Sequence, residues 1–148
     1  MAASADPSRR FATAVSLLGE QMGADLGAAW DSLTGLQIVL LKIIARDERV
    51  TRTDLMTEAR TSRAAMVPGL ASLIQKGFIV EPGGFGDTYL AVAPAGQELL
   101  AHVENARAVW VSRAAQHAMP AVRGEDLNRA ARLLEHLAGN TDHAQHTG

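Results

Sequence analysis

The segment from Leu33 to Gly96 constrains the fold of this chain more than any other part. Its first apolar helix pattern follows Thr34 and Gln37, which have the Ser/Thr-x-x-Glu/Gln spacing of a capping box. A short polar helix is expected next, opened by Thr51 or Thr53. A second apolar helix and two strand-like runs complete the segment. The segment therefore combines three helices with a small sheet.

The third helix of this segment is expected to begin after Ser62, whose hydroxyl can cap it. Met66, Leu70 and Leu73 follow at the i, i+4, i+7 spacing of one helix face. Gly77 lies just past the pattern, where a residue in the left-handed conformation often ends a helix. These positions predict a helix with one buried face and a defined end.

Two strands are predicted after this helix, over residues 78–80 and 88–92. The turn Glu-Pro-Gly-Gly-Phe-Gly-Asp at residues 81–87 joins them. The order of three helices followed by a hairpin is that of a winged helix-turn-helix. We therefore expect a mainly α fold with a small β wing, which most often serves to bind DNA.

Helical patterns flank the winged segment on both sides, and Ser8 is expected to cap the first helix, through Ala29. The length of the chain suits one domain with a sizeable core. The polar composition near the C-terminus predicts a frayed tail. The expected organisation is one domain over residues 1–148, with helices over 1–32 and 95–139, the winged module over 33–94 and a flexible tail over 140–148.

Gly19, Gly23 and Gly27 recur every four residues in the first helix pattern. Each glycine costs about 1 kcal/mol of helix propensity relative to alanine. Close packing of a partner helix would offset this cost, so we expect a helix from this chain or another to pack on this face.

The composition excludes several classes of protein. The chain has no cysteine, which excludes disulfides and thiol chemistry. No apolar run reaches the ~18 residues of a membrane span, and the N-terminus lacks the apolar core of a signal peptide. A cytoplasmic protein with no membrane partner is therefore expected. The formal net charge of -2 does not favour DNA binding, although one positive face would be sufficient.

The ordered set of motifs resembles the MarR family of winged-helix regulators over most of the chain. The matching positions are Leu33-Thr34, Gln37, Leu40-Leu41 and Ile44 in the opening helix, Leu55 in the short helix, Leu73 and Gly77-Phe78-Ile79 at the end of the third helix, and Val92 and Gly96 before the long helix. The resemblance implies an obligate homodimer built from the N- and C-terminal helices. It also implies a small-molecule cleft between the dimerisation and DNA-binding parts.

Several positions depart from the family pattern, which has a polar recognition helix and a wing with an Asp-x-Arg motif. Pro68 lacks an amide and costs about 3 kcal/mol within a helix, so we expect a kink or local unwinding there, beside Gly69. The wing holds no Lys or Arg, and phosphates would repel Glu81 and Asp87. Residues 49–92 carry five basic and four acidic side chains, which makes the module nearly neutral.

The candidate DNA-binding residues are Arg52, Arg60, Ser62, Arg63 and Lys76. Arg63 can make the bidentate contact that reads guanine, and Arg52 and Arg60 can hold phosphates. The alternative is that these arginines form ordinary solvated surface. The outward positions of the third helix are expected to be Ser62, Arg63, Ala65, Pro68, Gly69 and Ser72.

The candidate ligand pocket is bordered by apolar side chains from several helices. These residues are Met22, Leu26, Trp30, Leu33, Met66, Val67 and Trp110. The alternative is core or dimer packing, which is the usual role of apolar residues at helical spacing.

The sequence contains no recognised motif for catalysis, phosphate binding or metal binding. His143 and His146 are spaced by three, but no cysteine or acidic cluster completes a metal site, and a solvated tail accounts for them. No role is assigned to His102 or His117. We therefore expect no metal and no cofactor, and the residues favour a protein that is not an enzyme.

Two hypotheses about function remain. The first is a ligand-responsive MarR-like transcriptional regulator that binds double-stranded DNA as a homodimer. The second is a dimer of the same fold that binds or transforms a small apolar molecule and has lost DNA binding. The fold alone does not decide between them.

Overall fold

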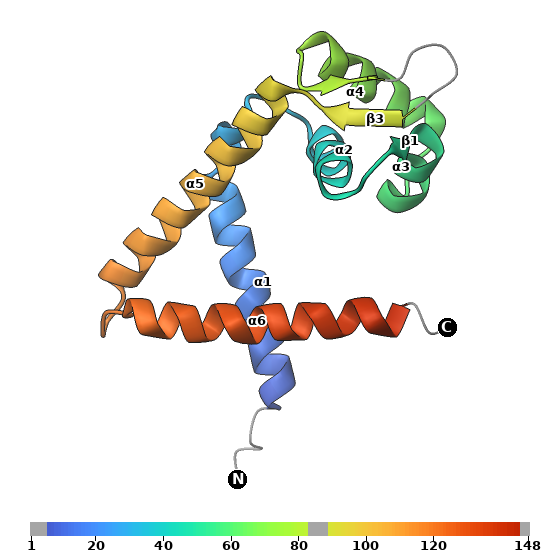
Figure 1. Cartoon of the computed structure of the whole chain (residues 1–148). Helices are drawn as coiled ribbons and strands as arrows, with labels where there is room; N and C mark the ends of the chain where they lie inside the picture. Colours follow the sequence, from blue (N-terminus) through green and yellow to red (C-terminus); the bar gives the residue numbers. More distant parts are fainter. Residues whose placement is uncertain (1–5, 83–88, 146–148) are drawn as a thin grey trace. The chain divides into compact units, whose positions relative to one another are not determined.

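The computed structural model describes residues 6–82 and 89–145, with side chains described as far as residue 139. The chain divides into two compact units, Met1–Arg107 and Ala108–Gly148. Helices dominate the described residues, and three short strands make up the sheet (Figure 1). The mainly α winged helix-turn-helix with a small β wing is confirmed.

The first helix, α1, spans Pro7–Asp25 and is followed by the 3-10 helix η1 at Gly27–Trp30. The N-cap is Asp6 instead of Ser8, because the Asp6 carboxylate accepts a hydrogen bond from the Ser8 amide at 3.1 Å. The predicted extension of this helix to Ala29 is wrong, since the chain tightens into 3-10 geometry after α1 ends.

Helix α2 spans Gly35–Arg46 and is central to the core of the winged module. Its predicted capping box is confirmed. The Thr34 hydroxyl accepts from the Gln37 amide at 3.2 Å, and Gln37 Oε1 accepts from the Thr34 amide at 2.9 Å. The buried core is made of Trp30, Leu33, Leu40, Leu41, Ile43, Ile44, Val50, Leu55, Met66, Leu70, Leu73, Phe78, Ile79, Leu90, Leu99 and Val103.

Helices α3 (Arg52–Ala59) and α4 (Arg63–Gln75) form the helix-turn-helix. Thr51 caps α3 and Ser62 caps α4, as predicted, each by accepting a hydrogen bond of 3.2 Å from the amide three residues on. Gly77 has a φ of +80°, the left-handed conformation predicted for the residue just past this helix. Local sequence signals therefore locate these helix ends well.

The sheet consists of β1 (Val50–Thr51), β2 (Ile79–Val80) and β3 (Tyr89–Val92), in the antiparallel order β1-β3-β2. Strands β2 and β3 agree with the two predicted strands. Strand β1 was not predicted, because two residues show no alternation of their own. It is formed by pairing with a distant segment, in a register that places Val50 opposite Leu90.

Helix α4 lies close against α2 at Gly69. A Cβ atom added at Gly69 would lie 3.5 Å from Cγ of Gln37 and 3.9 Å from Cδ1 of Leu40. The Gln37 side chain also donates from Nε2 to the Gly69 carbonyl at 3.4 Å. The prediction that Gly69 faces outward is therefore wrong, because this residue is the contact point between the two helices.

Helix α4 continues across Pro68 without interruption, so the predicted local unwinding does not occur. Proline removes the backbone hydrogen bond of its own amide and leaves the other bonds of the helix possible. Met66 and Leu70, which lie two residues to either side, are both buried in the core. Their packing holds the helix in place on both sides of the proline.

The long helix α5 spans Pro94–His117, and α6 spans Gly124–Gln145. Near the start of α6, the Asp126 carboxylate accepts a hydrogen bond from the Arg123 amide at 3.2 Å. The helix continues past residue 139, where the tail was expected to begin, and residues 146–148 lie outside the described residues. None of the helices in the described part of the chain is long and apolar enough to cross a membrane.

The backbone of Phe78, just before β2, and the start of α5 meet at Gly96. The Phe78 carbonyl accepts a hydrogen bond from the Ala93 amide at 2.9 Å, which holds the two segments together. A Cβ atom at Gly96 would overlap this same carbonyl oxygen and would lie 2.7 Å from Cγ1 of Val92. Glycine is therefore required here by close approach of backbone to backbone.

Replacement of Gly96 by alanine is expected to destabilise the winged module by about 1–3 kcal/mol, the usual range for overpacking a filled site. The carbonyl cannot retreat without losing its hydrogen bond to Ala93. Urea unfolding followed by circular dichroism measures the change. Gly35→Ala is the matched control, because no described atom lies within 4 Å of the added Cβ. Equal unfolding midpoints for the two variants would contradict this account.

Candidate DNA-binding surface and ligand cavity

Helix α4 presents one face to solvent and buries the other. Met66, Leu70 and Leu73 are buried. The exposed residues of α4 are Arg63, Ala64, Ala65, Val67, Pro68, Ala71 and Gln75. The face opposite the core is therefore made mostly of hydrocarbon side chains.

Only part of this face was predicted. Ser62, Arg63, Ala65 and Pro68 are exposed as expected, whereas Ser72 is half-buried. The exposed residues that sequence analysis missed are Ala64, Val67, Ala71 and Gln75. The exposed face could have been predicted from the spacing of Met66, Leu70 and Leu73. A helix has a period of 3.6 residues, so the buried positions also define the positions on the opposite side.

Three candidate DNA-binding cations stand at the ends of α4. Arg60 is the C-cap of α3 with a φ of +50°, Arg63 is the first residue of α4, and Lys76 is its C-cap. All three side chains are exposed, and none of them takes part in a salt bridge found among the described residues. Ser62 differs, because its hydroxyl already accepts a hydrogen bond from the Ala65 amide. The three cations are available to an anion such as a phosphate.

The fourth candidate cation, Arg52, is already paired with a carboxylate. Its guanidinium forms a salt bridge with Glu81 at the start of the wing, and the two side chains are 39% and 40% exposed. A pair this exposed adds little stability because water and salt screen it. The pair does place a carboxylate beside a cation that was expected to hold a phosphate. Asp87, the second predicted acidic residue of the wing, lies outside the described residues.

A separate cavity of about 450 Å³ lies beside Trp30, within the larger unit. Its wall is made of Gly19, Met22, Gly23, Leu26, Gly27, Trp30, Ile38, Lys42 and Arg107. The three regularly spaced glycines are on this wall, and no described atom lies within 4 Å of a Cβ added at any of them. Their missing side chains leave space for the cavity, so the close helix packing predicted from them is not found within the described chain.

Two cations flank the indole ring in this cavity. Lys42 Nζ lies 5.3 Å and Arg107 Cζ lies 5.7 Å from the ring centroid of Trp30, which is within cation–π range. Neither cation takes part in a salt bridge found among the described residues. Partial burial, together with the charge of Arg107, lowers the pKa of Lys42 below its ordinary value. An anion between the two cations would relieve this repulsion.

The predicted pocket residues divide into two groups. Met22, Leu26 and Trp30 line the cavity. Leu33 and Met66 are buried in the core, and Val67 is 47% exposed on α4. Trp110 lies on the part of α5 that belongs to the smaller unit. Sequence analysis missed Lys42 and Arg107, because a lone basic residue in a helix has no pattern that marks it as part of a site.

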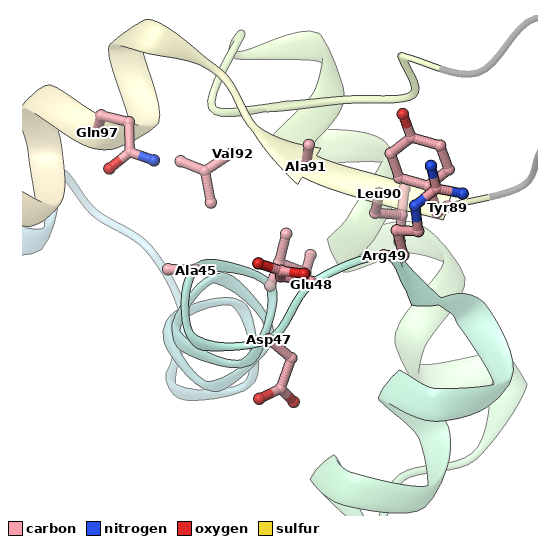
Figure 2. Close-up of a pocket in the computed structure, with 10 residues that line it drawn as sticks. Ala45, Asp47, Glu48, Arg49, Tyr89, Leu90, Ala91, Val92 and Gln97 are labelled. Carbon is pink, nitrogen blue, oxygen red and sulfur yellow. The ribbon is translucent and has the colours of Figure 1, made fainter.

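A second, more polar pocket of about 380 Å³ lies between the end of α2, strand β3 and the start of α5 (Figure 2). In this pocket Arg49 Cζ lies 5.2 Å from the ring centroid of Tyr89. Asp47 points away from the other labelled side chains and pairs with Arg46 at 3.1 Å, a hydrogen bond that lowers the pKa of Asp47. Asp47 and Arg49 are thus already engaged with other side chains, and we assign this pocket no ligand.

The three histidines whose side chains are described are not gathered into one site. His102, His117 and His136 are exposed, and Nδ1 of His117 lies 2.8 Å from the Arg113 carbonyl. The side chains of His143 and His146 lie outside the described residues. Within the described part, no three His, Cys, Asp or Glu side chains are gathered as metal ligands.

Several solved structures share this fold over almost their whole length. A putative transcriptional regulator from Pseudomonas aeruginosa has a TM-score of 0.71 and 24% identity, with 89% of this chain and 92% of that chain covered. The multiple antibiotic-resistance repressor MarR of Listeria monocytogenes has a TM-score of 0.60 and 14% identity, with 95% and 99% covered. NadR, solved in complex with 4-hydroxyphenylacetate, has a TM-score of 0.59 and 16% identity, with 90% and 98% covered.

No protein-family model matches the sequence, and no curated protein matches it in sequence. The likeness to solved structures establishes the fold, which is that of the MarR-type winged-helix regulators.

The pKa of Lys42 offers a direct check on the electrostatics of the cavity. The chain has two lysines, Lys42 and Lys76, so nuclear magnetic resonance of isotopically methylated lysines gives a simple spectrum. We expect one of the two resonances to titrate below the ordinary lysine range, and the Lys42→Arg variant to remove that resonance. A Lys42 ammonium that titrates at or above the value of free lysine would contradict the burial and repulsion described above.

Proposed function

We propose that this protein is a ligand-responsive transcriptional regulator of the MarR type, which binds double-stranded DNA as a homodimer. The observation that carries the proposal is the exposed α4 of a winged helix-turn-helix, with cations at both of its ends that form no salt bridge among the described residues. A helix of this kind enters the major groove in winged-helix and helix-turn-helix proteins. Arg63 would contact a base, and Arg60 and Lys76 would contact phosphates.

A homodimer accounts for apolar side chains that the single chain leaves in water. Helix α1 has no buried residue at all. The large apolar side chains exposed on α1 and α6 are Phe11, Val15, Leu17, Leu18, Leu133, Leu134 and Leu137. Groups of large apolar side chains left exposed on a helix are typical of protein–protein contacts. Residues 1–32 and 95–139 would supply the dimer contacts, and residues 33–94 the DNA contacts.

The proposal is tested by the affinity of the protein for its own upstream DNA at increasing salt concentration. Release of counterions from phosphates makes the logarithm of the binding constant fall linearly with the logarithm of salt, with a slope of about −0.9 per phosphate contacted. Two subunits with two phosphate contacts each should therefore give a slope near −4, as a rough estimate. The absence of binding at low salt would refute a DNA-binding function.

The pairing of Arg52 with Glu81 generates a specific prediction. In the Glu81→Gln variant Arg52 loses its carboxylate partner and can take a phosphate in its place. We expect tighter DNA binding and a salt dependence steeper by about 1 for each subunit. Glu104→Gln on the exposed surface of α5 makes the same change in net charge and is the control. Equal gains in the two variants would show that only net charge matters and that Arg52 does not contact DNA.

The cavity beside Trp30 supports the ligand-responsive part of the proposal. Its apolar wall suits a hydrocarbon or aromatic body, and Lys42 and Arg107 suit a negatively charged end. NadR was solved with 4-hydroxyphenylacetate, an aromatic carboxylate with both of these features. We propose that this chain binds an aromatic or aliphatic carboxylate, and that occupation of the cavity changes the position of α4 in the dimer.

Replacement of Lys42 by glutamine is expected to weaken binding of 4-hydroxyphenylacetate about tenfold or more, because a hydrogen bond to a charged group contributes roughly 1.5–3 kcal/mol. Isothermal titration calorimetry and quenching of tryptophan fluorescence measure the change. The Lys76→Gln variant is the control, since this lysine lies at the end of α4. If the neutral amide of the same compound bound as well as the acid, the cations would have no role in recognition.

The alternative function, a ligand-binding dimer that no longer binds DNA, retains some support. The hydrocarbon face of α4 and the Arg52–Glu81 pair both reduce the affinity expected for phosphates. Carboxylate binding together with no retention of DNA at any salt concentration would favour this alternative.

A further inference from the structure

The outermost residues of α4 form a stripe with an unusual composition for a helix that would read DNA. Ala64, Pro68, Ala71 and Gln75 are exposed and follow the i, i+4, i+7, i+11 spacing of a single helix face. Val67, which is 47% exposed, widens the stripe. Gln75 at the far end is its only polar side chain. We call these five residues the α4 stripe. The middle of the α4 stripe therefore presents hydrocarbon side chains and no side-chain hydrogen-bond donors.

The charges lie only at the ends of the α4 stripe. Arg60 and Arg63 are at its start, and Lys76 is at its end. Helix α4, which begins at Arg63 and ends just before Lys76, has 13 residues and is therefore about 20 Å long at 1.5 Å per residue. This arrangement complements a groove that has phosphates on both sides and base edges between them. It is less suited to an apolar protein surface, which would leave the terminal cations unpaired.

The chemistry of the base edges then decides which sequence can fit. In the major groove, bases present hydrogen-bond donors and acceptors, and thymine also presents its 5-methyl group. Hydrocarbon side chains would remove water from donors and acceptors without replacing its hydrogen bonds, which is unfavourable. The same side chains gain from contact with methyl groups. The stripe therefore matches thymine methyl groups better than any other feature of the groove.

We propose that the α4 stripe reads DNA by contact with thymine 5-methyl groups, so that the centre of each half-site is rich in A·T pairs. This inference rests on the proposed function as a DNA-binding regulator. Arg63 and Gln75 supply the hydrogen-bonded contacts at the two ends. Specificity in the middle comes from hydrocarbon contacts with Ala64, Pro68 and Ala71.

The test starts with selection of bound duplexes from a random pool by the full-length protein. In the selected duplex, thymines of the half-site centres are replaced by deoxyuridine, which pairs identically but lacks the methyl group. Each contacted methyl that is removed should weaken binding about fourfold, the factor that corresponds to burial of one CH₂-sized group. Deoxyuridine placed only in the flanking sequence is the matched control and should leave affinity unchanged.

The Ala71→Ser variant adds a test on the protein side. Its hydroxyl replaces hydrocarbon contact at an exposed position, so the ratio of thymine to deoxyuridine affinity should shrink. Ala101→Ser, on the exposed surface of α5, should keep the full ratio. Tight DNA binding that is indifferent to the methyl groups would overturn this inference and leave the proposed function standing. No selection of DNA at low salt would overturn both.

Discussion

The contact between α2 and α4 at Gly69 determines how the winged module presents its exposed helix. The absence of a side chain at Gly69 lets α4 lie within van der Waals distance of Gln37 and Leu40. Gln37 then uses both ends of its amide, one to close the cap of α2 and one to bind the Gly69 carbonyl. A buried polar side chain is tolerated here because its hydrogen bonds are made. The rotation of α4, and hence its exposed face, follows from this contact.

Salt bridges engage some cations of the module and leave others without a carboxylate partner among the described residues. Arg46 pairs with Asp47 and Glu58, and Arg52 pairs with Glu81. The cations at the ends of α4 are left without such partners among the described residues. The module is nearly neutral in total, but three of the cations that lack a salt bridge among the described residues, Arg60, Arg63 and Lys76, lie at the ends of one exposed helix. Electrostatic attraction to phosphates depends on this placement more than on the sum of charges.

The cavity beside Trp30 depends on what is missing from α1. Three glycines spaced by four residues weaken the helix, yet they leave open the space that Lys42 and Arg107 reach from other helices. A larger residue at any of the three would project into this space. The glycines therefore lower the helix propensity of α1 but leave room for a cavity in which Lys42 and Arg107 both contact the Trp30 ring.

Sequence analysis located much of the fold because its signals are local. The capping residues Thr34, Thr51 and Ser62 and the left-handed Gly77 are all found where their hydrogen-bonding and backbone preferences place them. Three cavity residues, Met22, Leu26 and Trp30, were also among the predicted pocket residues. The C-terminal end of α1 was placed less accurately, because the chain tightens into 3-10 geometry after Asp25.

The amino-acid sequence by itself determined the order of the helices, the caps of α2, α3 and α4 and the apolar faces that these three helices bury, since these depend on neighbours within a few residues. Only the tertiary structure decided that Gly69 faces α2, that Val50 pairs across the sheet with Leu90, and that Glu81 forms a salt bridge with Arg52. It also decided that Lys42 and Arg107, 65 positions apart in the numbering, flank the same Trp30 ring. Contacts between distant segments depend on how whole elements pack, and no local pattern in the chain records them.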